Sequence, residues 1–145
     1  VEADPTNRYV AIDIMDGYSI PCPADMPSVH EAGSFSGPAI SAVSAVASKL
    51  AHEFPNLKIE TIAYHKAGTE VPPTRGHLFT DGLHPNVVIM YCMDAEDNAL
   101  GLDSPQNNDT LTNLRGWSEA NNNLCFVFCA CVRCNLTKHQ KCGTG

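Results

Sequence analysis

Acidic, aromatic and imidazole side chains follow three of the apolar runs in this sequence. Asp16 comes shortly after the first run, and Asp94 and Glu96 come directly after the third. The second run ends in Tyr64 and His65. Two carboxylates across a cleft can serve as a general acid and as a base or nucleophile, while an aromatic ring and an imidazole can hold a polar ligand. The pattern therefore makes these five residues the candidate catalytic and substrate-binding side chains.

Each candidate also has a structural interpretation. Asp16 precedes a glycine and could form a simple turn. The acidic residues after the third run could be a solvated loop, and they lack the spacing of an EF-hand. Tyr64 could be a core tyrosine beside a surface histidine. Trp117 falls on the apolar side of an expected helix, so we predict that it packs in the core.

The elements that must position these residues alternate along the chain. β-Branched and aromatic residues favour strands in four segments, at residues 9–14, 57–64, 86–92 and 124–132. A helix is expected from near Pro38 to Phe54, with Ser36 as its cap and Pro55 as its stop. A second helix is expected over residues 109–120, and residues 19–37, 65–85 and 93–108 are expected to be loops.

This order predicts an α/β fold of parallel β-α-β units. The connection over residues 65–85 has no helical pattern, although parallel pairing requires it to cross over the sheet.

Composition limits the classes of partner. The chain has 145 residues and a formal charge of −7, without a cluster of Lys and Arg, so we expect no nucleic-acid partner and no anionic membrane partner. No apolar run approaches the about 20 residues of a membrane span. The polar N-terminus carries no signal peptide, so we expect either a mature form or a piece of a larger chain.

Seven cysteines and two glycosylation sequons, at Asn108 and Asn135, favour a secreted or extracellular protein. The C-terminal cysteines and His139 offer enough ligands for zinc, but the spacing is not that of a standard finger. Disulfides, a zinc site and free thiols all stay open, and of these we favour disulfides. We expect no cofactor, and we divide the chain into residues 1–124 and a cysteine-rich tail, 125–145.

Several features in a fixed order resemble a known family. They are Asp16 before Cys22, the turn Glu53–Asn56, the strand Ile59–Tyr64, Pro72-Pro73, His84–Val87 before a strand ending at Cys92, and Leu114–Ser118. This series is similar to the DUF4838 family over about residues 9–124.

The resemblance implies part of a (β/α) barrel of about four strands, related to α-glucuronidase-like and hexosaminidase-like hydrolases. It therefore implies a carbohydrate substrate, with Asp16 and either Asp94 or Glu96 as catalytic carboxylates and with Tyr64 and His65 against the sugar. A full barrel needs about 200 residues or more. The expected protein is thus a fragment, a truncated relative, or a half-barrel completed as a homo-oligomer or by missing barrel segments.

The chain departs from the family pattern in two respects. The first loop keeps one cysteine, Cys22, and the strand-like run 125–131 carries no acid. The missing acid, together with the incomplete barrel, the cysteines and the sequons, favours a non-catalytic extracellular module that binds glycan or forms a structural assembly. A cysteine-rich metal domain is the third interpretation.

Overall fold

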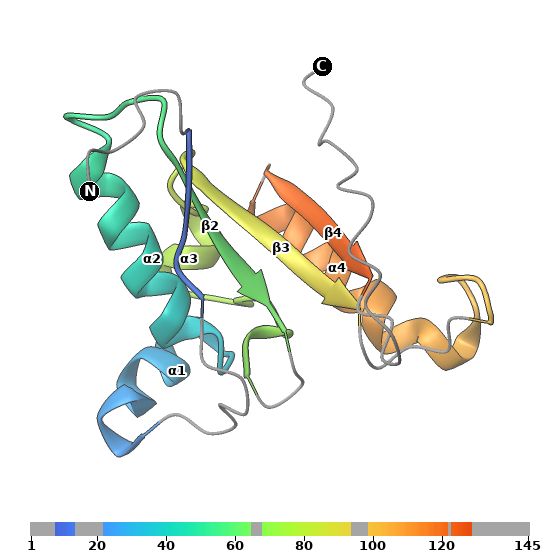
Figure 1. The fold of residues 1–145 in the computed structure, drawn as a ribbon. Helices are drawn as coiled ribbons and strands as arrows, with labels where there is room; N and C mark the ends of the chain where they lie inside the picture. Colours follow the sequence, from blue (N-terminus) through green and yellow to red (C-terminus); the bar gives the residue numbers. More distant parts are fainter. Residues whose placement is uncertain (1–7, 14–21, 65–67, 94–98, 122, 129–145) are drawn as a thin grey trace.

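The computed structural model describes residues 8–13, 22–64, 68–93, 99–121 and 123–128. Its centre is a sheet of four strands: β1 (Tyr9–Ala11), β2 (Lys58–Ala63), β3 (Val87–Met93) and β4 (Leu124–Phe128). The strands are all parallel and lie in the order of the chain, β1-β2-β3-β4. Figure 1 shows this sheet with its helices. The predicted α/β class with parallel β-α-β units is therefore confirmed.

The helices connect the strands and cover one face of the sheet. They are η1 (Pro23–Asp25), α1 (Met26–Ala32), α2 (Gly37–Leu50), α3 (His77–Thr80), η3 (Pro105–Asn107) and α4 (Asn108–Ala120). Side chains from α2, α3 and α4 share a single hydrophobic cluster with β2 and β3. Consecutive parallel strands with helices on one face are the arrangement found in segments of (β/α) barrels.

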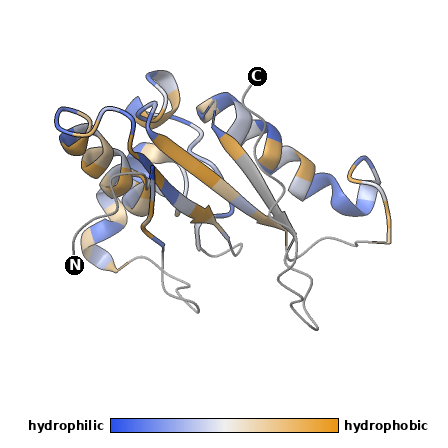
Figure 2. Cartoon of the chain, turned by 45° about the horizontal axis from the view of Figure 1, so that its top comes forward, coloured by the Kyte–Doolittle hydropathy of each residue, from blue (hydrophilic) through white to orange (hydrophobic). Residues whose placement is uncertain are grey.

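The two faces of the sheet differ in burial along β2, whereas β3 is buried on both faces. In β2, Ile59 and Ala63 are buried in the cluster, whereas Glu60 and Ile62 alternate with them and are half-buried. Ile59 pairs with Val87, so the same register continues into β3. β3 is the most apolar strand along its length, as Figure 2 shows. A run without polar alternation suits a central strand that is covered on both sides.

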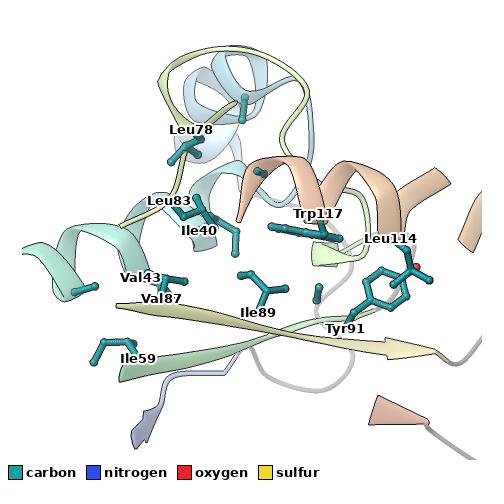
Figure 3. Packing of buried hydrophobic residues seen from close by; sticks show 14 of the residues in the cluster. Ile40, Val43, Ile59, Leu78, Leu83, Val87, Ile89, Tyr91, Leu114 and Trp117 are labelled. Atoms are coloured by element: carbon teal, nitrogen blue, oxygen red, sulfur yellow. The ribbon is translucent and has the colours of Figure 1, made fainter. Parts of the chain in front are cut away.

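The core lies between the helices and this sheet (Figure 3). Ile40 and Val43 of α2 share this cluster with Ile59 and Val87 of the sheet and with Trp117 of α4. Trp117 has no exposed surface, so its predicted core position is confirmed.

Two α-helices, and the two short helices η1 and η3, lie within segments that were predicted to be loops. α1 forms inside residues 19–37 because Pro27 occupies its first turn, where a missing N–H breaks no hydrogen bond, and because Gly33 ends it at φ +69°. α3 forms inside residues 65–85 and buries Leu78 in the core. This short helix and its flanking loop make the crossover between β2 and β3, which explains how these strands pair in parallel.

The first long helix is shorter than predicted. α2 ends at Leu50, and Phe54 is 52% exposed rather than part of the apolar stripe. Pro55 disfavours helical backbone in the residue before it, so the last turn leaves the helix early. Ser36 does stand at the N-cap, but its hydroxyl pairs with Ser34 Oγ at 2.9 Å instead of capping the helix.

The C-terminal strand crosses the predicted domain boundary. β4 covers Leu124–Phe128 and pairs with β3, so the proposed division between residues 124 and 125 falls within a strand of the sheet. Within the described residues, no helix is both long and apolar enough to cross a bilayer.

Candidate functional site

The carboxyl ends of the parallel strands lie at one edge of the sheet. β1, β2 and β3 are adjacent and end at Ala11, Ala63 and Met93. The chain therefore leaves all three strands at the same edge, which is where ligands bind in sheets of this kind. Tyr64 follows β2 directly and is half-buried there.

Most of the predicted site residues follow these same strand ends. Asp16, His65, Asp94 and Glu96 lie outside the described residues, so their roles stay predictions. Of the predicted catalytic and substrate-binding residues, the structure places Tyr64 alone.

Thr69 fixes the backbone at the end of β2 and at Tyr64, which follows it. Its hydroxyl donates to the Ile62 carbonyl at 2.8 Å and accepts from the Tyr64 amide at 3.1 Å. Its own amide donates to the Tyr64 carbonyl at 3.1 Å. Three short polar contacts therefore join the end of β2 to residue 69.

Glu70 is the most unusual residue near this edge. It is a carboxylic acid with 1% of its surface exposed. Its Oε1 accepts one hydrogen bond from the Tyr91 hydroxyl and one from Asn113 Nδ2, each at 3.1 Å. Its Oε2 is buried and has no hydrogen-bond partner among the described residues. Buried polar atoms usually find a partner, so this oxygen requires an explanation.

We call residues 68–73 the strap, because they run across α4 and back toward α1. The backbone carbonyl of Glu70 accepts a hydrogen bond from Trp117 Nε1 at 2.8 Å. The Val71 carbonyl accepts one from Ser34 Oγ at 2.6 Å. Pro72 lies so close to Gly116 that a Cβ on the glycine would stand 2.6 Å from the proline ring.

Most of this cluster could not be predicted from the sequence. Glu70 lies in the predicted loop 65–85, where a charged residue is expected to be solvated. Asn113 lies four residues before Trp117 and therefore on the same helix face, which was the available signal that a polar side chain enters the core.

The described histidines do not form a site. His77 contacts Glu31 at a shallow hollow beside α1, where both side chains are more than half exposed. The His84 ring accepts a hydrogen bond from the Asn86 amide at 3.1 Å. No group of three metal-ligating side chains occurs in the part of the chain that the structure describes.

Two cysteines can be placed. Cys22 is exposed, with its Sγ 3.2 Å from Asp25 Oδ2, and Cys92 is buried in β3. No disulfide joins two cysteines whose side chains the structure describes. The predicted disulfides and the alternative zinc site depend on the C-terminal cysteines. The side chains of those cysteines are not among the ones that the structure describes.

One of the two predicted glycosylation sites can be placed. Asn108 is exposed at the start of α4, but Thr110 of the same sequon is 4% exposed. The threonine that completes the sequon is thus buried in the fold. Asn135 lies outside the described residues.

Comparison with known families decides the relationship. The family described as a domain of unknown function, DUF4838, matches residues 1–141. The chain belongs to the DUF4838 family. The match to DUF4838 extends beyond the predicted residues 9–124 and includes most of the cysteine-rich segment. No curated protein and no solved structure matches the chain.

Proposed function

We propose that this DUF4838 chain is a carbohydrate-active domain that holds a glycan at the carboxyl ends of its parallel strands. The supporting observation is the sheet itself, in which β1, β2 and β3 are adjacent, parallel and covered by helices on one face. This topology directs three successive strand–loop junctions to one edge. Sugar hydroxyls need several polar groups converging from different loops, and such an edge can supply them.

In this proposal, Asp16 and one of Asp94 or Glu96 carry out the hydrolysis of a glycosidic bond. One carboxyl group protonates the leaving oxygen, and the other acts as nucleophile or activates water. Tyr64 stacks on a sugar ring and His65 binds its hydroxyls. The protein is secreted, and glycosylation and disulfides belong to the same extracellular setting.

A panel of chromogenic glycosides tests the hydrolase. Asp16→Asn removes the charge and keeps the shape, so we expect turnover of a responsive substrate to disappear while the circular dichroism spectrum is unchanged. Asp103→Asn is the matched control, because Asp103 is an exposed carboxylate in another loop. Unchanged turnover in Asp16→Asn would exclude its catalytic role.

A second function, binding glycan without hydrolysis, is favoured by the exposure of the edge strand β1. Tyr9 and Val10 of this edge strand are 53% and 44% exposed, so the described sheet is not closed into a barrel on that side. A homo-oligomer, or assembly with further barrel segments, would cover this edge.

A glycan array separates the two functions. Binding without turnover supports the binding module, and turnover contradicts it. Tyr64→Ala should remove about 1–3 kcal/mol of stacking energy, by analogy with aromatic stacking on other ring ligands. Phe54→Ala is the control, since Phe54 is exposed before the start of β2, at the opposite edge of the sheet.

A further inference from the structure

Glu70 has a role that the proposed function does not assign. We propose that Glu70 is a positioning residue, which anchors the strap so that Thr69 holds Tyr64 in place at the ligand-binding edge. The ligand part of this inference rests on the proposed function. The positioning part rests on contacts within the protein.

The first step is the anchoring of residue 70 itself. The Tyr91 hydroxyl comes from β3 and the Asn113 amide comes from α4, and both donate to the same carboxylate oxygen. Trp117, one turn further along α4, donates to the backbone carbonyl of residue 70. Residue 70 is therefore tied to a central strand and to a helix, both of which belong to the core.

The second step carries this anchoring to Tyr64. Thr69 is bonded covalently to Glu70, so its position follows from that of its neighbour. The Thr69 hydroxyl bridges the Ile62 carbonyl and the Tyr64 amide, and the Thr69 amide binds the Tyr64 carbonyl. The backbone of Tyr64 is consequently fixed by a residue that would move if Glu70 were released.

The third step is that stability alone does not explain a carboxylate at residue 70. Its Oε2 has no hydrogen-bond partner among the described residues, and a buried polar atom in this state destabilises a fold. An apolar side chain would avoid this loss but would take away the acceptor that Tyr91 and Asn113 share. Glu70 Oε1 is thus the atom that matters for the positioning, because it accepts hydrogen bonds from β3 and from α4.

Hydrogen exchange of single amides, measured by NMR on the whole chain, tests the positioning. Glu70→Leu removes Oε1, so the amides of Tyr64 and Thr69 should exchange about tenfold faster or more. Glu70→Gln keeps an acceptor oxygen at the same place, so it should restore slow exchange at both amides. The Ile89 amide, which donates to the Asn123 carbonyl at 3.0 Å, reports on the sheet.

Val43→Ala is the matched control, because it truncates a buried side chain of α2 and should therefore lower the free energy of unfolding without changing a residue of the strap. The proposal is supported if the amides of Tyr64 and Thr69 exchange faster in Glu70→Leu than in Val43→Ala. Equal exchange in the two variants overturns it. If Glu70→Leu does not fold, Tyr91→Phe removes one donor from Oε1 and should accelerate the same two amides, and no acceleration there overturns the proposal as well.

A binding measurement tests the ligand part separately. The oligosaccharide with the strongest signal on the array should bind Glu70→Leu about tenfold more weakly than Glu70→Gln. Equal affinities with altered exchange would contradict the link between the strap and the ligand. If no array glycan binds the unmodified chain, the proposed function fails, while the exchange experiment still decides the role of Glu70.

Discussion

The layer between helices and sheet has two halves that are held together by different forces. Beneath α2 the buried side chains are aliphatic, since Ile40 and Val43 share the core cluster with Ile59 and Val87. The contact is apolar, and its free energy depends on the area buried and on the fit of the side chains. Such a contact stabilises the fold but tolerates small shifts.

Beneath α4, the contact is organised by hydrogen bonds. Trp117 and Asn113 donate to Glu70 from the helix, and Tyr91 donates to it from β3. Hydrogen bonds are directional and weaken steeply when their geometry changes. The comparison teaches that the α2 half supplies stability, whereas the α4 half also fixes the position of the loop at the ligand-binding edge.

Trp117→Ala should produce the largest effect, because it removes both a large buried ring and the hydrogen bond to the Glu70 carbonyl. We expect a loss of about 3–5 kcal/mol in the free energy of unfolding. Urea denaturation measures the loss. Exchange of the Thr69 amide should accelerate as well, and a stability loss that left this amide protected would weaken the distinction between the halves.

Ile40→Ala tests the half of the core beneath α2 by removing a buried aliphatic side chain. Ile40 is fully buried, so its truncation should lower the free energy of unfolding by about 2–4 kcal/mol, again by urea denaturation. The amides of Tyr64 and Thr69 should then exchange faster only as far as global stability falls. A selective effect on these two amides would show that the halves are coupled more tightly than their contacts indicate.

Gly116→Ala tests how tightly the strap packs against α4. The new methyl group would stand 2.6 Å from Pro72, so the strap or the helix must shift. Alanine favours the helix by about 1 kcal/mol, and overpacking costs about 1–3 kcal/mol, so we expect a net loss of about 1 kcal/mol. Thermal unfolding measures this loss, with Glu119→Ala as an exposed control on the same helix. A more stable variant would mean that the strap moves freely.

Tyr91→Phe should have a small effect on stability, similar to that of Gly116→Ala. It removes one of two donors from Glu70 Oε1 while leaving the aromatic ring in the core. We expect a loss of about 1 kcal/mol by urea denaturation, which is typical of a single buried hydrogen bond. The sharper result is local, since the Thr69 amide should respond while the Ile89 amide does not.

The apolar half was readable from the sequence. The spacing of Ile40, Val43 and Ala47 predicted a helix with one buried stripe, and the apolar run at residues 87–92 predicted a central strand. Both patterns arise from burial, which repeats with the period of the element. The parallel topology followed from the alternation of these elements, and the short helices α1 and α3 were missed because prolines, glycines and brief apolar contacts carry no such period.

The polar half could not be read in this way. Glu70 becomes special only because Tyr91 and Asn113, which are 21 and 43 residues further along the chain, converge on it. Nothing local to residue 70 signals that convergence. The roles predicted for Asp16, His65, Asp94 and Glu96 stay predictions, since they lie outside the described residues.

The strand order has a consequence for how the protein acquires its fold. Each strand pairs with the strand that precedes it in the chain, so every new hydrogen-bonded ladder is added to a surface that has already been synthesised. β1, β2 and β3 are therefore all synthesised before α4 and β4. The Glu70 contact with Tyr91 joins residues that are synthesised before α4, whereas its contacts with Asn113 and Trp117 require α4, so the anchoring of the strap is complete only when α4 is in place.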